Sequence, residues 1–395
     1  MLSYVGPVTQ LPPHFTLLQV TPELETGGAE QTTVDVARAV VQAGGEALVA
    51  SAGGRMAPAL ADAGGVLIEM PAQSKNPLTI AANAIRLARI IRDEGVSLIH
   101  ARSRAPAFSA LSAAKATGVP FVATYHGVYN AKGRLKRWYN AVMTRGDVVI
   151  ANSEYTRGHV IEQHGVDPDK VVAIPRGVDL TRFDPARVDP DRLEALRSAW
   201  RLDPADTRVK VLLAGRLTRW KGQLLLIEAA ARLKASGETN FLILLAGDDQ
   251  GRSAYRAELE QAIARHGLQE QVTLVGHCED MPAAYLLADV AAAPSLDPEA
   301  FGRTAVEPQV MGRPVLAAAH GATTETVVDG ETGWLVAPGD ADAWAKALRT
   351  AINTTARQRA AMGKAARERA CRLYSVEAMC EATLAVYARV LEARR

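Results

Sequence analysis

The segment from Glu299 to Glu307, EAFGRTAVE, carries two carboxylates eight positions apart. Pro298 and Gly302 place Glu299 on a loop, and residues 304–311 are typical of the first turns of a helix. The carboxylates therefore bracket a helix N-terminus, where unpaired N–H groups and the helix dipole favour a phosphate. Eight helical residues rise about 12 Å, which matches a ligand with hydroxyls at both ends and phosphates in the middle, such as a sugar–diphosphate–ribose. Acidic residues are also common at helix starts, and the spacing alone does not separate the two interpretations.

A second segment of the same half of the chain carries cations. Gly215, Arg216 and Lys221 lie in a loop that follows the predicted strand 209–214 and opens a helix. A guanidinium fork and a mobile ammonium both suit a diphosphate. The loop lacks the GxxxxGK[ST] pattern of a Walker A motif. The alternative is a solvated basic loop, but the pair of glutamates, which is in the same domain and also follows a strand, favours the phosphate interpretation.

Three further signals after predicted strands are weaker. A glycine pair ending at Gly28 follows the strand predicted at 16–21 and permits close backbone approach to a ligand. His126 follows the strand predicted at 120–124, and His277 follows a later strand. The alternatives are a tight turn for the glycines and local hydrogen bonding for the histidines.

Nothing in the sequence predicts a metal ion or another cofactor. The DxD strings at 167–169, 189–191 and 340–342 contain proline or stand where helices begin, which is typical of turns and helix caps. No cluster of histidine and cysteine has the spacing of metal ligands.

The composition is that of a globular protein with two domains. The chain has 395 residues, of which 48% are apolar and 22% charged, and its length exceeds one ordinary core. A net charge of +2 does not predict nucleic-acid binding. The three scattered cysteines, the absence of lysine and arginine before Arg38, and the lack of an 18-residue apolar run predict a reduced, cytoplasmic protein.

Short apolar runs alternate with helical patterns along the whole chain. Unbroken apolar runs predict strands buried on both faces of a parallel sheet. The first series of predicted strands is 16–21, 46–52, 66–70, 96–100, 120–124, 147–151 and 171–174. The second is 209–214, 241–246, 272–275, 290–293, 314–318 and 334–336. The proline-rich residues 177–208 between them are interpreted as a linker with one short helix, and 340–395 as helical with a break near Tyr374.

These series predict an α/β protein of two doubly wound, Rossmann-like domains that face a central cleft. In such sheets ligands bind at the carboxyl ends of the strands. The segments around Arg216, Glu299 and His126 all follow strands, as a site of this kind requires.

A basic and aromatic segment follows His126. Cations beside aromatic rings can dock on an anionic membrane surface, and a solvated helix face is the equal alternative. Its residues are Lys132, Arg134, Lys136, Arg137, Trp138 and Tyr139.

In combination, these segments resemble glycosyltransferase family four, the retaining glycosyltransferases of the GT-B fold. The resemblance follows the family's order over nearly the whole chain and is specific only as a combination. The matching pieces are residues 27–30 (GGAE), 125–127 (YHG), 151–153 (ANS), 175–179 (PRGVD) with Phe183, 215–222 (GRLTRWKG) and 298–307 (PEAFGRTAVE).

The resemblance implies an N-terminal acceptor-side domain (1–180), a C-terminal nucleotide-sugar domain (181–372) and a last helix (373–395) that crosses back to the first domain. It implies sugar transfer from a nucleotide-diphosphate sugar to a saccharide or lipid-linked acceptor, in cell-envelope polysaccharide or lipopolysaccharide synthesis, without a metal. The implied catalytic residues are Arg216, Lys221, Glu299 and His126. The implied donor-binding residues are Gly28, Gly215, Phe301, Gly302, Arg303, Thr304, Glu307 and His277.

Two features depart from the family pattern. Pro308 directly follows Glu307 and is tolerable only if it lies in the first turn of its helix. Gly321-Ala322 replaces a glycine pair, with little expected effect. Two other functions stay open, namely a GT-B sugar-nucleotide epimerase and a non-catalytic two-lobed protein that binds sugar nucleotides.

Overall fold

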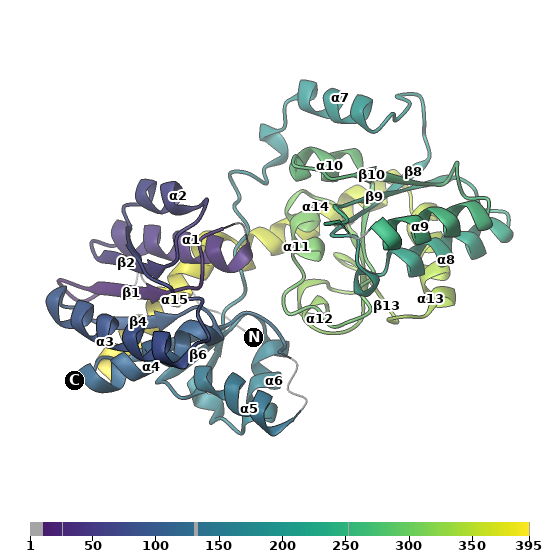
Figure 1. The fold of residues 1–395 in the computed structure, drawn as a ribbon. Helices are drawn as coiled ribbons and strands as arrows, with labels where there is room; N and C mark the ends of the chain where they lie inside the picture. Colours follow the sequence, from purple (N-terminus) through teal and green to yellow (C-terminus); the bar gives the residue numbers. More distant parts are fainter. Residues whose placement is uncertain (1–10, 26, 130–132, 252, 395) are drawn as a thin grey trace. The chain divides into compact units, whose positions relative to one another are not determined.

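The computed structural model describes residues 11–25, 27–129, 133–251 and 253–394. The chain divides into two compact units (Figure 1). Unit 1 is Met1–Gly177 together with Val376–Arg395, and unit 2 is Val178–Ser375. The boundaries predicted from the sequence, near residues 180 and 372, differ from these by a few residues.

Unit 1 is built on a parallel sheet of seven strands in the order β3-β2-β1-β4-β5-β6-β7. Alternate residues of a strand enter opposite cores. Leu18 and Ile99 pack in one cluster, and Leu17 and Leu98 pack in another. The strands are β1 (Thr16–Val20), β2 (Glu46–Ser51), β3 (Val66–Glu69), β4 (Leu98–Ala101), β5 (Phe121–Tyr125), β6 (Val148–Ala151) and β7 (Val171–Ala173).

Helices cover both faces of this sheet. They are α1 (Gly28–Gln42), α2 (Ala57–Asp62), α3 (Pro77–Asp93), α4 (Arg104–Thr117), α5 (Arg134–Asn140), α6 (Glu154–His164) and α15 (Val376–Glu392). The predicted alternation of strands and helices did not give bounds for α2 and α6, because α2 has six residues and α6 has little apolar periodicity. The prediction that every strand is buried on both faces is wrong for β3, an edge strand in which Val66 is 55% exposed.

The last helix, α15, completes the core of unit 1. Figure 1 shows it in yellow among the purple and blue elements of that unit. Met379, Leu384, Tyr387 and Val390 of α15 pack with β1, β4 and α1 residues in one buried cluster. Unit 1 is therefore discontinuous in sequence, because α15 packs in the same core as the first half of the chain.

Unit 2 has a parallel sheet of six strands in the order β10-β9-β8-β11-β12-β13. They are β8 (Val209–Ala214), β9 (Phe241–Ala246), β10 (Val272–Gly276), β11 (Val290–Ala293), β12 (Val315–Ala318) and β13 (Gly333–Val336). The helices are α7 (Pro190–Ala199), α8 (Gln223–Ala235), α9 (Ser253–Arg265), α10 (Met281–Leu287), α11 (Arg303–Val310), α12 (Thr323–Thr326), α13 (Ala341–Asn353) and α14 (Ala356–Leu373).

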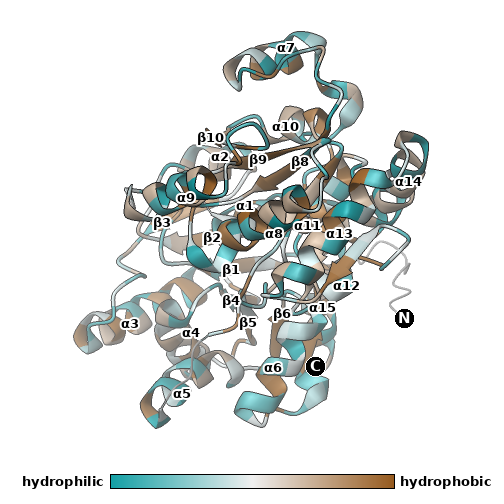
Figure 2. Cartoon of the chain, turned by 90° about the vertical axis from the view of Figure 1, so that its right-hand side faces the viewer, coloured by the Kyte–Doolittle hydropathy of each residue, from teal (hydrophilic) through white to brown (hydrophobic). Residues whose placement is uncertain are grey.

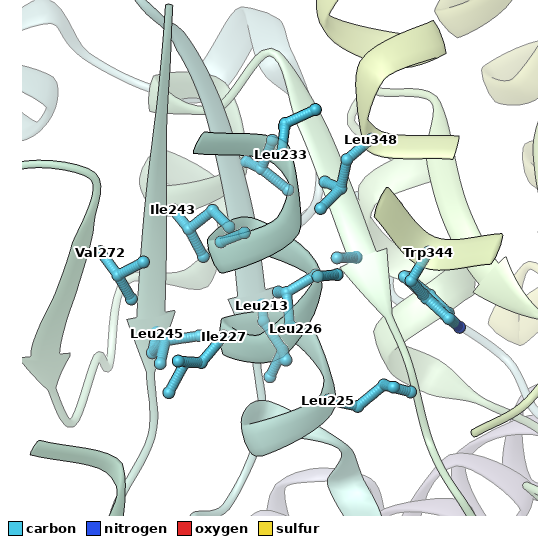
Figure 3. Packing of buried hydrophobic residues seen from close by; sticks show 14 of the residues in the cluster. Leu213, Leu225, Leu226, Ile227, Leu233, Ile243, Leu245, Val272, Trp344 and Leu348 are labelled. Atoms are coloured by element: carbon cyan, nitrogen blue, oxygen red, sulfur yellow. The ribbon is translucent and has the colours of Figure 1, made fainter. Parts of the chain in front are cut away.

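The core of unit 2 lies where α8 and α13 meet the sheet. Figure 3 shows Leu226 and Ile227 of α8 pointing toward Leu213 and Leu245 of the strands, with Trp344 of α13 beside them. Figure 2 shows that the strands are largely hydrophobic and that the helices are hydrophilic on part of their surface. Each strand predicted in both units is present, with its ends shifted by at most about two residues.

The short helix predicted within residues 177–208 is confirmed as α7, but the residues on either side of it are not only a linker, because some of them pack in unit 2. Phe183 and Trp200 are buried in a core cluster of unit 2, together with β8 and β9 residues. Each is an isolated aromatic residue without a periodic apolar pattern around it, so the sequence did not predict that it is buried. The predicted break at Tyr374 separates α14 from α15, but a second break at Thr355 was not predicted. Thr355 forms a capping box with Gln358 there.

Candidate functional site

The loops after β8 and β11 are joined in unit 2, at the point where the strand order of the sheet reverses. Gly222 has φ of 79°, and a Cβ atom on it would lie 2.0 Å from the Pro294 carbonyl oxygen. Leu296 N also donates to the Trp220 carbonyl at 2.6 Å. Only glycine at 222 permits this approach, which holds the basic loop against the loop that carries Glu299.

Lys221 and Glu299, predicted separately, form an ion pair. Lys221 Nζ lies 2.5 Å from Glu299 Oε1, and the two side chains are 12% and 13% exposed. Ser295, a buried residue that the sequence did not single out, donates its hydroxyl to the same carboxylate oxygen at 2.7 Å. In this structure the cation expected to bind phosphate is therefore neutralised by the carboxylate expected to bind sugar.

Arg216 differs from Lys221 because it is exposed. Its carbonyl accepts from Gln223 Nε2 at 2.9 Å, and no hydrogen bond of its guanidinium is found within the described part of the chain. Gly215 lies directly before it, in contact with the loop after β9. A Cβ on Gly247 would lie 1.9 Å from the Gly215 carbonyl oxygen, so the two backbones touch. The backbone of Arg216 is therefore fixed by its neighbours, while its guanidinium makes no hydrogen bond within the described chain.

The N-terminus of α11 starts from Gly302, whose φ of 77° belongs to the left-handed region. Ala305 N donates to the Gly302 carbonyl at 2.8 Å. Within the described chain, the N–H groups of Gly302, Arg303 and Thr304 make no hydrogen bond, as is usual for the first N–H groups of a helix. The Phe301 ring is buried against Tyr374, with ring centroids 5.7 Å apart. Phe301 therefore anchors the turn in the core and offers only its backbone.

Glu307 is held inside α11 and is 8% exposed. It accepts from Arg303 Nε at 2.8 Å and from the Tyr285 hydroxyl at 3.2 Å. Burial, followed by the charge of Glu307, raises the pKa of Tyr285 well above its ordinary value, which keeps the hydroxyl protonated as a donor. The sequence did not single out Tyr285, since a tyrosine in a helix has many roles.

The expectation that Pro308 is tolerable only in the first turn is wrong. Pro308 is the sixth residue of α11, and the helix continues through it to Val310. The lost N–H would have bonded the Thr304 carbonyl. Gln309 supports the turn, because its Nε2 donates to the carbonyls of Ala305 at 2.8 Å and Thr326 at 3.0 Å.

The loop after β12 fixes Glu299 from the other side. Gly321 has φ of 64°, and a Cβ on it would lie 2.7 Å from the Glu299 carbonyl oxygen. Ala322 N donates to that oxygen at 2.9 Å. Ala322 is fully buried, so its methyl group is accommodated where a second glycine was expected. His320 Nε2 lies 2.8 Å from the Ser295 carbonyl oxygen.

His277 stands apart from these residues. It is exposed and follows β10, which β9 separates from β8 in the sheet. Within the described residues, no hydrogen bond or ion pair joins it to the Lys221–Glu299 pair. The structure therefore brings together Gly215, Lys221, Glu299 and the start of α11, but not His277.

Gly28 and His126 belong to unit 1. Gly28 is the first residue of α1, and a Cβ on Gly27 would lie 2.3 Å from Glu30 Oε2, so the Glu30 carboxylate folds over the helix start. His126 follows β5, and both of its ring nitrogens are shielded from solvent without a hydrogen-bond partner in the described chain. Burial, then the charges of Arg176 and Arg102, lower the pKa of His126 well below its ordinary value. Its imidazole is neutral at pH 7.

The predicted role of the DxD strings as helix caps is confirmed. Asp167, Asp189 and Asp340 each accept a hydrogen bond from the backbone N–H two residues later, at the start of a helix. Over the residues that the structure describes, no three histidine, cysteine or acidic side chains lie together as metal ligands would.

The basic and aromatic segment forms α5, except for Lys132, which lies outside the described residues. Leu135 is 84% exposed and Trp138 is 55% exposed. Lys136 and Arg137 are exposed between them. Arg145 lies over the Trp138 ring, with its Cζ 5.7 Å from the ring centroid. Among the helices of the described chain, none combines the length and the apolar character needed to cross a bilayer.

Two Rossmann-like units, each built on a parallel sheet, are the fold of the GT-B class of glycosyltransferases. Comparison with family models gives the same class. The model "Glycosyltransferase Family 4" matches residues 26–182, and the model "Glycosyl transferases group 1" matches residues 197–369. The chain belongs to glycosyltransferase family 4, a family of retaining GT-B enzymes.

Individual relatives agree with this family. A crystal structure of a glycosyltransferase from Rickettsia africae ESF-5 has a TM-score of 0.88 and 34% identity, over 96% of this chain and 100% of the other. The Anabaena protein HepE in complex with UDP-glucose has a TM-score of 0.78 and 25% identity, over 96% of this chain and 100% of HepE. A D-inositol 3-phosphate glycosyltransferase from Salinispora arenicola is 32% identical over 64% of this chain and 57% of the relative. The chain thus spans little more than half the length of the curated relatives that it matches.

Proposed function

We propose that this protein transfers a sugar, with retention of anomeric configuration, from a nucleotide-diphosphate sugar to an acceptor hydroxyl. The main observation behind this proposal is the Lys221–Glu299 ion pair, which lies in the same loop region as the exposed Arg216. An ion pair that is mostly shielded from water, next to a free guanidinium, is a binding arrangement for a ligand that has hydroxyls and a diphosphate. Family membership supports the same activity.

In this proposal each residue acts on one part of the donor. Arg216 and Lys221 bind the diphosphate, together with the free N–H groups from Gly302 to Thr304. Glu299 binds hydroxyls of the transferred sugar, and Glu307 binds the ribose. His126 lies beside the transferring sugar, while Gly28 allows the first loop to approach the diphosphate. Gly215, Phe301 and Arg303 position these groups through their backbones and contacts, and His277 borders the base.

The reaction separates charge, and the proposed residues stabilise the charge that develops on the leaving group. Cleavage of the sugar–phosphate bond leaves positive charge on the anomeric carbon and extra negative charge on the diphosphate. Fixed cations and a helix N-terminus stabilise the leaving group. The acceptor oxygen attacks from the face that the diphosphate leaves, and a diphosphate oxygen takes the acceptor proton. Both bonds to the anomeric carbon then lie on one face, which gives retention.

HepE binds UDP-glucose, which makes a UDP-hexose the first donor to test. A saccharide or lipid-linked acceptor of cell-envelope synthesis is the proposed acceptor class. Exposed Leu135 and Trp138 among the cations of α5 support a peripheral contact with anionic lipid, which would bring the enzyme to a lipid-linked acceptor.

A thermal-shift screen of UDP-, GDP- and ADP-sugars tests donor binding. A donor at 100 times its dissociation constant should stabilise the native state by about 2.7 kcal/mol. Transfer is then measured with the best donor in EDTA, where activity should persist. Interconversion of the free donor without transfer would indicate the epimerase, and binding without any turnover would indicate the non-catalytic protein.

A further inference from the structure

Arg102 is a buried cation at the carboxyl end of β4 in unit 1. It follows the last residue of the strand and is 2% exposed. Its Nε donates to Gln19 Oε1 at 2.8 Å, its Nη2 donates to the same oxygen, and its Nη1 lies 3.5 Å from Thr124 Oγ1. Gln19 is fixed in turn, since its Nε2 donates to the Thr33 carbonyl at 2.9 Å. These bonds use three of the five N–H bonds of the guanidinium.

The buried charge of Arg102 has no carboxylate bound to it within the described chain. Asp35 attracts it, but that carboxylate accepts from Gln31 Nε2 at 2.8 Å and lies 3.8 Å from Arg38. Burial lowers the pKa of Arg102. A guanidinium is nevertheless charged in proteins, and burial of an unpaired charge is unfavourable. Arg102 therefore carries positive charge and unused donors that an anion would satisfy.

More basic groups lie around Arg102. Burial, then the charges of Arg176 and Arg102, lower the pKa of His126. Burial, then the charges of Arg102 and His126, lower the pKa of His100. Both ring nitrogens of His100 are hydrogen-bonded, Nδ1 to the Tyr387 hydroxyl at 2.6 Å and Nε2 to the Thr124 hydroxyl at 2.7 Å. Both ring nitrogens of His126 are buried and unbonded within the described residues. Arg176 Nη2 donates to the His126 carbonyl at 3.2 Å, which places a second guanidinium at the same strand ends.

We propose that Arg102, His126 and Arg176 form a binding site in unit 1 for an anionic group of the acceptor, a phosphate or a carboxylate. A guanidinium binds either anion through paired N–H bonds, and a neutral imidazole with a free N–H adds one donor. The proposal rests on the proposed function, because it assigns the anion to the acceptor. The donor already has cations in unit 2, at Arg216 and Lys221, so the acceptor is the substrate left to supply this charge.

Inorganic phosphate is the first probe, titrated against the whole chain by thermal shift with UDP at saturation. UDP fills the proposed diphosphate site, so the remaining shift reports the site in unit 1. Phosphate should raise the melting temperature of the wild type, and Arg102→Gln and Arg176→Gln should each weaken phosphate binding about tenfold or more. Arg89→Gln, which removes an exposed arginine on α3 of the same unit, should bind phosphate as the wild type does. Equal phosphate binding by all four proteins would overturn the proposal.

A signal from His126 itself separates binding from a purely structural role of Arg102. With histidines labelled with 13C and the His126 signal assigned through His126→Gln, phosphate should move the His126 resonance in the wild type, and the same shift in Arg176→Gln should need about tenfold more phosphate. If Arg102→Gln does not fold, Arg176→Gln decides the question, since Arg176 is only partly buried. An unmoved His126 signal in wild-type protein would overturn the proposal.

Acceptor and donor are distinguished by kinetics. Arg176→Gln should raise the KM for a phosphorylated or carboxylated sugar acceptor and leave the dissociation constant of UDP unchanged. A weaker UDP complex instead would assign the anion to the donor and overturn the acceptor assignment. Absence of any nucleotide binding in the wild type would contradict the proposed function, while the His126 titration would still decide whether unit 1 binds phosphate.

Discussion

At the scale of single residues, the proposed donor site requires the ion pair of Lys221 and Glu299 to open or to be shared with the ligand. Arg216→Ala and Lys221→Ala should each lower kcat by about 10²–10³, since each removes positive charge from the leaving diphosphate. Their stabilities should differ. Arg216 is exposed, so its loss should leave the melting temperature unchanged. Lys221→Ala leaves a largely buried carboxylate without its cation and should cost about 1–3 kcal/mol.

Steady-state kinetics and thermal unfolding of both variants check this prediction. Arg219→Ala is the matched control, because Arg219 lies in the same loop but is paired with Glu258 on the surface. Near-normal kcat in both Arg216→Ala and Lys221→Ala would remove the diphosphate assignment.

Glu299 and Glu307 should respond differently to replacement by glutamine. Glu299→Gln alters a group proposed to orient the sugar and should lower kcat. Glu307→Gln alters a group proposed to bind the ribose and should raise the donor KM with little change in kcat. Arg303 and Tyr285 hold the side chain at 307 in place, so the variant should fold. A donor titration of both variants is the measurement, and exchanged phenotypes would place the donor in the opposite direction along α11.

Residue types and strand ends allowed Lys221 and Glu299 to be selected from the sequence, but not their contact. The two residues are 78 positions apart, and only the neighbouring strands β8 and β11 bring their loops together. Arg102 was missed for a related reason. It follows a predicted strand, as the selected residues do, but its lack of a carboxylate partner within the described chain is a property of the packed unit.

At the scale of elements, the loops of unit 2 depend on glycines that no side chain can replace. Gly222→Ala would place a Cβ 2.0 Å from the Pro294 carbonyl oxygen and separate the basic loop from the Glu299 loop. We expect a loss of stability above the 1–2 kcal/mol or so of left-handed strain, together with weaker donor binding. Gly237→Ala is the control, because Gly237 has φ of 89° and a Cβ added there would meet no described atom within 4 Å. Equal losses in the two variants would show that strain, and not the loop contact, sets the cost.

The helix α5 should dock on anionic lipid. The double variant Lys136→Ala, Arg137→Ala should reduce sedimentation with anionic vesicles at low salt, because it removes the charges beside exposed Trp138. The double variant Arg357→Ala, Arg372→Ala removes two exposed arginines of α14 and should sediment as the wild type does. Salt should weaken the binding. Equal recovery of the wild type on neutral and anionic vesicles would support a solvated helix face instead.

Strands were easier to predict than helices because parallel strands buried on both faces are unbroken apolar runs. The edge strand β3 and the short helix α2 have weaker patterns, and the bounds of α2 were not predicted. Pro308 shows the limit of local rules. Proline in a helix usually breaks it, but α11 is held by Gln309 and by a surrounding buried cluster.

At the scale of the whole molecule, the core of unit 1 combines α15 with strands and helices from the first half of the chain. α15 supplies the Tyr387 hydroxyl to His100, and His100 in turn contacts β5. The sequence predicted a final helix that returns to the first domain only through resemblance, since helical periodicity does not say which sheet a helix covers. The polar link from Tyr387 through His100 to Thr124 lies within the same unit as the proposed anion site at Arg102.

This arrangement should make unit 1 sensitive to acid. Burial lowers the pKa of both His100 and His126 well below the ordinary 6.5, so below about pH 6.5 the unfolded chain takes up protons that the folded unit does not. Stability is therefore full above that pH and falls as the pH drops, by up to about 1.4 kcal/mol per pH unit for each histidine. Unfolding at a series of pH values from 7.5 to 5 measures the slope, and hydrogen exchange in β4 and α15 localises it. His100→Gln should reduce the slope, whereas His277→Gln, which changes an exposed histidine of unit 2, should leave it intact. A stability that stays constant over this range would contradict the burial of neutral histidines at the core of unit 1.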